Sequence, residues 1–156
     1  MIYIFDTNSF IVAGHYFPGR FPSFWRNFDE MVLKNKILSV REVYHELDNN
    51  ISKKHLSDWI YLNKKIFLIP GPEETKFVNE IFRIQHFRDL VDQKKILKGG
   101  TVADPFVIAS AKIKNACVVT EEKFKENAAK IPNVCKYFKI ECTNLEGFME
   151  REKWEF

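Results

Sequence analysis

Ile2-Tyr3-Ile4-Phe5-Asp6-Thr7-Asn8 is a short apolar run that leads directly into an acidic residue and an amide. An all-apolar run of this length is typical of a central strand that is covered on both faces. Asp6 and Asn8 would then lie at the carboxyl edge of a parallel sheet, where α/β folds bind their ligands. An Asx-turn, in which Asp6 accepts hydrogen bonds from nearby backbone amides, is an equally good interpretation of this residue alone.

The remaining sequence alternates short apolar runs with stretches of helical periodicity. Strands are expected at residues 2–5, 37–40, 66–69, 117–120 and 138–142, and helices at 9–13, 23–34, 41–49, 52–64 and about 73–97, with a break near 85–88. Strands that alternate with helices imply right-handed crossovers and a parallel sheet. We therefore expect an α/β fold, a three-layer α/β/α sandwich with a mainly parallel sheet of about four to five strands.

Three helix starts can be read from local signals. Ser23 is expected to cap the helix at 23–34. Asp104 followed by Pro105 predicts an N-cap with proline at the first helical position. Thr143-x-x-Glu146 has the spacing of a capping box and predicts a last helix.

Composition limits the class of protein. The 156 residues, 46% of them hydrophobic, suit one compact domain spanning residues 1–156. The net charge of +3 is unevenly distributed. Residues 141–156 contain five Glu against Arg151 and Lys153 and carry a net charge of −3, so residues 1–140 carry +6. A mildly basic body permits a polyanionic partner without requiring one. The three cysteines form no CxxC pair and no apolar run reaches membrane-spanning length, so we expect reduced thiols in a cytoplasmic protein away from membranes.

Further acidic residues fall where the same sheet edge is within reach. Glu46 lies beside the apolar stripe of its helix, where an unpaired charge is costly. Asp104 lies at a predicted helix start, which keeps its carboxylate ionised, and Glu121 and Glu122 follow the strand at 117–120. Each has a simpler alternative: a solvated helix residue, a helix cap, or two exposed loop acids.

Carboxylates gathered at one edge repel one another unless some are protonated or a cation joins them. A hard divalent metal ion is the usual answer, which indicates a metal-dependent hydrolase. Other enzyme classes fit less well. His45-Glu46 lacks the second histidine of a zinc-protease helix. An aspartyl-phosphate phosphatase needs a second Asp where this sequence has Asn8.

Four motifs resemble those of PIN-domain nucleases, and the resemblance covers essentially the whole chain. They are Phe5-Asp6-Thr7-Asn8, the helix that carries Glu46, Ala103-Asp104-Pro105-Phe106-Val107-Ile108-Ala109, and Val118-Val119-Thr120-Glu121-Glu122. Residues 99–111 and 131–135 look most similar to a bacterial PIN-like subfamily, itself similar to VapC-type toxins.

The resemblance implies a metal site made by Asp6, Glu46, Asp104 and Glu122. The family usually has Asp in the fourth place, so either Glu122 or its neighbour Glu121 fits it. It further implies Mg²⁺- or Mn²⁺-dependent cleavage of single-stranded RNA, by in-line attack of an activated water on phosphorus. Asp6 and Asp104 are the expected direct ligands, with Glu46 and Glu122 completing the site directly or through water. The residues expected to orient a carboxylate or a water are Asn8, Thr120 and Glu121.

Substrate contacts are predicted on two segments. Lys94, Lys95 and Lys98 are close in sequence to Asp104 and are expected to bind phosphates, and Arg20 lies in a loop whose rings suit stacking on unpaired bases. A solvated helix end and core-facing rings are the alternative.

Two functions fit these residues. The first is an endoribonuclease that acts as the toxin of a type II toxin–antitoxin system, with a cognate antitoxin protein and a homodimer implied by the resemblance. The second is a PIN-like RNA-binding or assembly module that has lost turnover, with Glu122 as its main argument.

Overall fold

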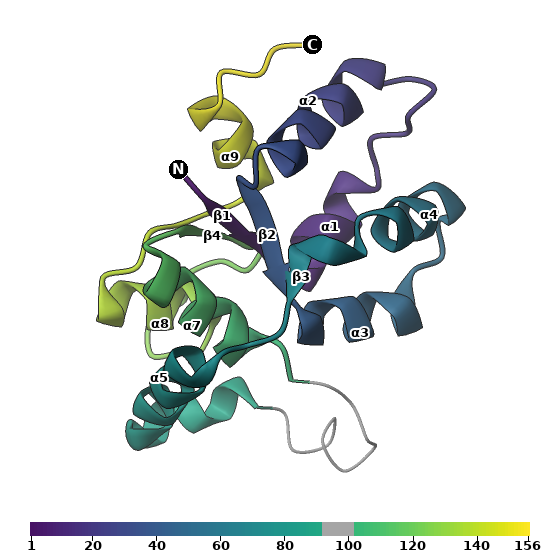
Figure 1. Cartoon of the computed structure of the whole chain (residues 1–156). Helices are drawn as coiled ribbons and strands as arrows, with labels where there is room; N and C mark the ends of the chain where they lie inside the picture. The colour runs from purple at the N-terminus through teal and green to yellow at the C-terminus, as the bar shows by residue number, and fades with distance from the viewer. Residues whose placement is uncertain (92–101) are drawn as a thin grey trace.

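A sheet of parallel strands forms the centre of the computed structural model, which describes residues 1–91 and 102–156. Its strands are β1 (Tyr3–Phe5), β2 (Ile37–Val40), β3 (Phe67–Leu68), β4 (Cys117–Val119) and β5 (Cys142–Thr143). They lie in the order β3-β2-β1-β4-β5, and each neighbouring pair is parallel (Figure 1). The carboxyl end of β1, the middle strand, is therefore flanked by the ends of β2 and β4.

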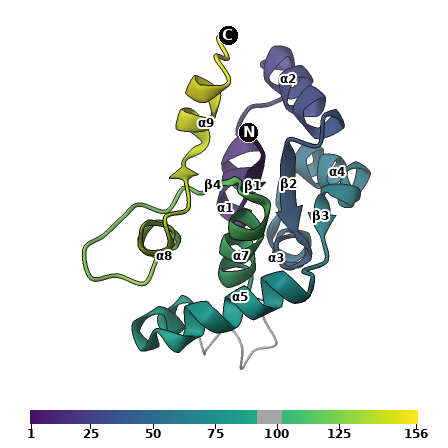
Figure 2. The ribbon, with the colours of Figure 1, turned by 60° about the vertical axis from the view of Figure 1, so that its left-hand side comes forward.

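Helices cover both faces of this sheet. They are α1 (Thr7–Ala13), α2 (Pro22–Leu33), α3 (Arg41–Asn50), α4 (Lys54–Leu62), α5 (Pro72–Arg83), α7 (Asp104–Lys114), α8 (Ile131–Phe138) and α9 (Leu145–Arg151), with short 3₁₀ turns η1 (Lys64–Ile66) and η2 (Gln85–Leu90). On one face α7 packs on β1, β2 and β4, with α5 and α8 beside it. On the other face α1 lies between α3 and α9, and α2 packs on β2 (Figure 2). The predicted three-layer α/β/α fold with a mainly parallel sheet is confirmed.

An aromatic cluster fixes the position of β1. Phe5 is fully buried, and its ring lies 5.3 Å from Phe10, 5.4 Å from Phe28 and 5.2 Å from Phe148, centroid to centroid. These rings come from α1, α2 and α9, so three helices of one layer meet at the last residue of the strand. Such close packing holds Asp6, the next residue, in a fixed place.

Most predicted elements are present, and the last part of the sheet is the main exception. A strand was expected at 138–142, whereas Phe138 ends α8 and β5 contains only Cys142 and Thr143. Lys139 has φ 56°, a left-handed conformation that ends the helix. Residues 138–142 alternate apolar Phe138, Ile140 and Cys142 with charged Lys139 and Glu141, a strand-like pattern, although they contain the end of a helix and the start of an edge strand.

The predicted helix caps are wrong in detail. α2 begins at Pro22, one residue before the expected cap Ser23. α7 begins at Asp104 itself, with Ala103 in the capping position. α9 is capped by Asn144, whose Oδ1 accepts a hydrogen bond from the backbone of Gly147 at 2.9 Å, and not by a box starting at Thr143. The capping residue of α2 is Phe21, two residues before Ser23, and those of α7 and α9 each lie one residue from the expected position.

The three cysteines are free thiols. Cys117 and Cys135 are buried, and Cys142 is half-buried. Within residues 1–91 and 102–156, no helix is both long and apolar enough to cross a bilayer.

Candidate functional site

Asp6 lies at the carboxyl end of β1 and caps α1. Its Oδ1 accepts a hydrogen bond from the backbone N–H of Ser9 at 2.8 Å, so the predicted Asx-type cap is present. Its Oδ2 accepts a second from the hydroxyl of Thr120 at 2.6 Å. Thr120 follows β4, and its predicted role of orienting a carboxylate matches this contact. The side chain is only 4% exposed, so both hydrogen bonds are sheltered from water.

The Asp6 carboxyl is electrostatically unusual. The pKa of Asp6 is raised from 3.8 to about 6, mainly because burial disfavours the ionised form; the negative charge of Glu122 adds to the rise, and the hydrogen bonds from Thr120 and Ser9 oppose it. A pKa raised in this way means that the ionised form lacks a full counter-charge among protein groups. A cation beside Asp6 would supply that counter-charge.

Glu121 and Glu122 both contact the starts of helices. Glu122 Oε2 accepts a hydrogen bond from the backbone N–H of Ile131, the first residue of α8, at 2.8 Å. Glu121 Oε1 accepts one from the N–H of Leu145, the first residue of α9, also at 2.8 Å. Glu122 is among the groups that raise the pKa of Asp6, and its own N–H donates to the hydroxyl of Thr120 at 3.2 Å. Glu122 is therefore close enough to Asp6 for their charges to interact.

Glu46 reaches the same edge from α3. It is 8% exposed, as its position beside the apolar stripe predicted, and it accepts a hydrogen bond from the hydroxyl of Thr7, the neighbour of Asp6. One turn earlier, Glu42 is equally buried, pairs with Arg41 through Oε1 at 3.0 Å, and has no hydrogen-bond partner for Oε2 within the described residues.

Sequence reasoning missed two of these groups and did not name a third. The hydroxyl of Thr7 donates to Glu46, and Glu42 lies one helical turn before Glu46, whereas the backbone donor expected for Asp6 was not assigned to Ser9. The spacing of Glu42 and Glu46, four residues apart on the helix that follows β2, was the available signal.

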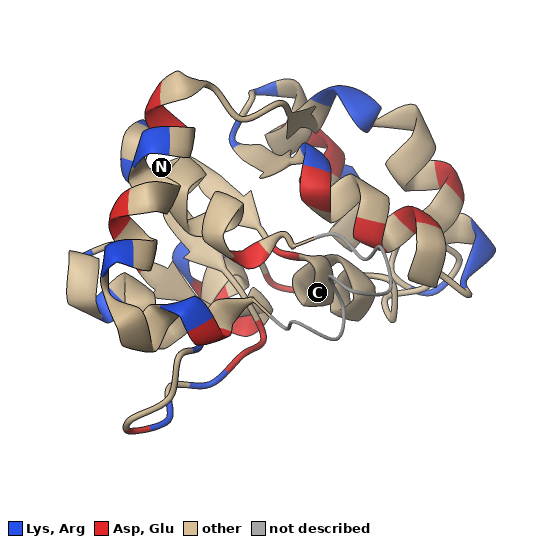
Figure 3. Ribbon diagram, turned by 90° about the horizontal axis from the view of Figure 1, so that it is seen from below, with Lys and Arg blue, Asp and Glu red and all other residues tan. Residues whose placement is uncertain are grey.

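The remaining predicted site residues are Asp104 and Asn8. Asp104 is half-buried at the start of α7, and because α7 leads into the parallel strand β4, this start faces the carboxyl edge. Asn8 is exposed. Figure 3, viewed from below the sheet of Figure 1, shows acidic segments near the centre of the molecule. Even so, residues 1–91 and 102–156 contain no group of three or more His, Cys, Asp and Glu side chains that could hold a metal ion.

The donor chemistry still fits a magnesium-type ion. Mg²⁺ keeps several waters and binds through one or two carboxylates together with substrate phosphate, so it does not require a complete protein cage. The charge of Glu122 acts on Asp6, and the hydroxyl of Thr120 donates to Asp6 Oδ2 while it accepts from the backbone N–H of Glu122. This pair has the charge and the oxygen ligands that such an ion prefers.

A cavity of about 550 Å³ opens beside these acids, and we call it the glutamate pocket. Its lining residues are Thr120, Glu121, Glu122, Lys123, Phe124, Pro132, Lys136, Ile140, Cys142, Thr143 and Asn144. It therefore brings together the end of β4, the start of α8 and the end of β5, with lysine and carboxylate side chains on its walls.

Of the predicted RNA contacts, Arg20 is the one that lies within the described residues. Lys94, Lys95 and Lys98 lie outside the described residues. Arg20 is exposed in the loop after α1, whose other end holds Asp6, and a helix of this length spans about 10 Å. Tyr16 in the same loop stacks on Phe24 at 4.4 Å, so its ring faces the core as the alternative interpretation stated.

The chain is similar to a family and to solved structures. The model of the family described as "Domain of unknown function (DUF4411)" matches residues 3–156. A chain in the crystal structure of VapBC2 from Rickettsia felis bound to a DNA fragment from their promoter is 18% identical, with a TM-score of 0.51 over 92% of this chain and 98% of that one. PAE2754 from Pyrobaculum aerophilum is 13% identical, with a TM-score of 0.43 over 89% and 97% of the two chains. No curated protein matches the sequence significantly. The similarity to VapBC2 shows a shared fold.

Proposed function

This chain belongs to the DUF4411 family, and we propose that it is a metal-dependent nuclease of the PIN type that cleaves single-stranded RNA. One observation carries the proposal: Asp6 is buried at the carboxyl end of the middle strand, and the charge of Glu122 helps to keep its pKa raised to about 6. A buried carboxylate next to a second acid, in a fold shared with a VapBC2 chain, supports a cation site.

Asp6 and Asp104, with Glu46 and Glu122, would hold Mg²⁺ or Mn²⁺. Such an ion, when bound, makes water a better nucleophile at neutral pH and neutralises charge on the phosphate. The chain's own groups orient the ligands. Thr120 and the Ser9 amide each fix one oxygen of Asp6. These contacts leave each oxygen of Asp6 a further lone pair for a cation.

The test is cleavage of a labelled single-stranded RNA with Mn²⁺ and with Mg²⁺. We expect the wild type to cut, EDTA to stop the reaction, and Asp6→Asn and Asp104→Asn to abolish it while remaining folded. Asp48→Asn is the matched control, since Asp48 is an exposed acid on α3, and it should retain full activity. Normal cleavage by Asp6→Asn would refute the assignment.

A second candidate, an RNA-binding or assembly module without turnover, is favoured by a specific observation. Glu121 and Glu122 are both used as hydrogen-bond acceptors for helix starts, and the described residues hold no three-ligand cluster. RNA binding that is independent of Mn²⁺, with no cleavage in either metal, would support this alternative over the nuclease.

We further propose that the nuclease is a toxin whose partner is an antitoxin protein, and that it forms a homodimer in a bacterial cytoplasm. The fold shared with a chain of a VapBC2 assembly supports a protein partner of this kind. Induced expression in a bacterial host should arrest growth for the wild type and not for Asp6→Asn. Sedimentation of the purified chain measures the dimer.

A further inference from the structure

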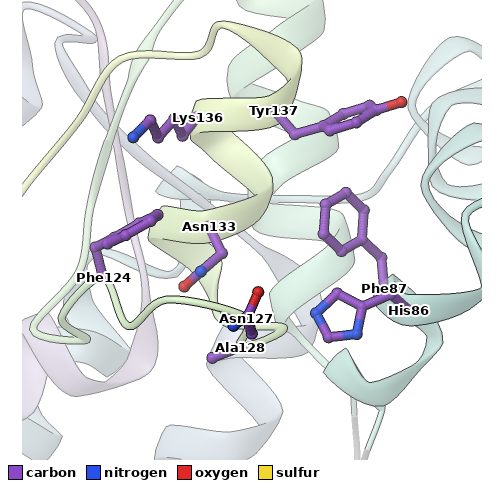
Figure 4. A pocket seen from close by; sticks show the side chains of 8 residues that line it. All are labelled: His86, Phe87, Phe124, Asn127, Ala128, Asn133, Lys136 and Tyr137. Carbon is purple, nitrogen blue, oxygen red and sulfur yellow. The ribbon is translucent and has the colours of Figure 1, made fainter.

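A second cavity lies beside the glutamate pocket, between the β4–α8 loop, α8 and η2. It has a volume of about 650 Å³ and we call it the aromatic groove. Its lining residues are His86, Phe87, Phe124, Asn127, Ala128, Asn133, Lys136 and Tyr137 (Figure 4). None of them was predicted as a functional residue, and two of them, Phe124 and Lys136, also line the glutamate pocket.

Aromatic rings stand at both ends of the groove. Phe124 is 51% exposed, and the ammonium group of Lys136 lies 4.7 Å from the centre of its ring. At the other end Tyr137 is 61% exposed and packs edge-on against buried Phe87, with centroids 5.3 Å apart (Figure 4). Exposed ring faces beside a cation suit unpaired bases, because every base has a face on which an aromatic ring can stack.

The loop that carries Phe124 is held in place before any ligand binds. Asn133 of α8 donates from Nδ2 to the carbonyl of Lys125 at 2.7 Å. Ala128 donates from its backbone to the same carbonyl at 3.0 Å, and Asn127 turns the chain with φ 61°. A loop fixed in this way loses little conformational entropy on binding, so its ring is preorganised.

Charge selects the class of ligand. Residues 123–139 contain five lysines and one glutamate, a net of +4 in a chain whose total is +3. This concentration of positive charge favours a polyanion over an ordinary protein surface. The groove is also continuous with the glutamate pocket, because Phe124 and Lys136 line both cavities.

We propose that the aromatic groove binds single-stranded nucleic acid, with bases stacked on Phe124 and Tyr137 and a phosphate on Lys136. The bound strand runs from the groove past Phe124 into the glutamate pocket. The path into the glutamate pocket rests on the proposed nuclease function, whereas binding in the groove can be measured without cleavage.

The experiment measures fluorescence anisotropy of a fluorescein-labelled twelve-nucleotide single strand, as RNA and as DNA, with the full chain in EDTA. Phe124→Ala, Tyr137→Ala and Lys136→Glu should each weaken binding about tenfold, since one stacked base or one phosphate contact is worth about that much. Phe124→Tyr keeps the ring and should bind as the wild type. Removing Lys136 should also reduce the salt dependence of binding by about one phosphate contact.

Matched controls lie on the opposite side of the sheet. Tyr61 on α4 is 73% exposed, and Lys64 lies 5.0 Å from the ring of Tyr44, a cation–ring pair like that of Lys136 and Phe124. Tyr61→Ala and Lys64→Glu should leave the affinity unchanged. Circular dichroism confirms that each variant is folded.

Several outcomes would overturn the inference. Unchanged affinity in the three groove variants would do so, as would equal binding of a duplex of the same sequence. A loss of self-association in sedimentation, with nucleic-acid affinity unchanged, would identify the groove as a protein interface instead. Binding that depends on the groove, without cleavage in Mn²⁺ or Mg²⁺, supports the groove and removes the nuclease. If the wild type cleaves RNA and the groove variants bind as tightly as the wild type, the nuclease proposal is supported and the groove proposal is wrong.

Discussion

Replacing Asp6 with asparagine should stabilise the metal-free protein at neutral pH while removing the proposed activity. The reason is the raised pKa of Asp6, about 6 in the folded protein against an ordinary value of 3.8. The folded protein therefore keeps this proton to a higher pH than the unfolded chain does. Stability from this group is complete below about pH 4 and is lost as the pH rises through 6.

The size of the effect follows from the two pKa values. Their difference corresponds to about 3 kcal/mol at pH 7. Asparagine keeps the hydrogen bond from the backbone of Ser9, and its amide faces the hydroxyl of Thr120 at a cost of about 1 kcal/mol that does not depend on pH. The advantage of Asp6→Asn over the wild type should thus grow by about 3 kcal/mol between pH 4 and pH 7.

Urea unfolding in EDTA, followed by circular dichroism at several pH values, measures this difference directly. Comparing the variant with the wild type at each pH cancels the titration of the groups that do not interact with Asp6; Glu122 does interact with it. Asp48→Asn, at an exposed position on α3, should show no such trend. Mn²⁺ at pH 7 should stabilise the wild type and not Asp6→Asn. A stability difference that stays constant from pH 4 to pH 7 would refute the electrostatic reasoning.

Three further predictions concern the groups that support the site and the fold. Thr120→Val removes a donor to buried Asp6 and should cost about 1–2 kcal/mol in urea unfolding, with weaker Mn²⁺ binding, whereas Thr120→Ser should restore both. Lys114→Met leaves buried Glu74 without its cation and should cost about 3 kcal/mol at pH 7. Burial raises the pKa of Glu74, but the hydrogen bonds from Lys114 and Gly71 and the charge of Lys114 together hold it below its ordinary value, so this cost should shrink at acidic pH, which a pH series of melting curves would reveal. Asn144→Ala removes the cap of α9 and should lower stability by about 1 kcal/mol in thermal unfolding, and Asn144→Ser should recover most of it.

The sequence predicted the layers of the fold because apolar runs and helical periodicity are local signals of buried faces. The strand at 37–40 has the expected bounds, and β1 and β4 differ from expectation by one residue. The signal was weakest where an element is short. At 138–142 a helix end is followed by an edge strand, so one stretch of alternating apolar and charged residues contains parts of two elements.

The candidate site was predictable only in part, for a different physical reason. Asp6 and Glu122 were identified because they follow strands that end at one edge. The hydroxyl donor Thr7 could not be identified, since a threonine after a strand is an ordinary cap residue until the partner acid is known. The Ser9 contact with Asp6 comes from a backbone N–H, which any residue but proline would supply there. The aromatic groove was equally hidden, because Phe124 and Tyr137 are 13 residues apart in a sequence with 15 phenylalanines.

The two adjacent glutamates show how one loop can serve both the fold and the site. Glu121 and Glu122 follow β4 and point to different helix starts, α9 and α8, where a carboxylate is stabilised by the helix dipole. An aspartate is one methylene shorter, so it reaches less far toward the first amide of α8 from the same backbone position. The length of the Glu122 side chain is thus explained by the anchoring of α8, and α8 carries Lys136 and Tyr137. The residue that acts on the charge of Asp6 also positions the helix that forms one wall of the aromatic groove, which couples the acidic site to the proposed strand path.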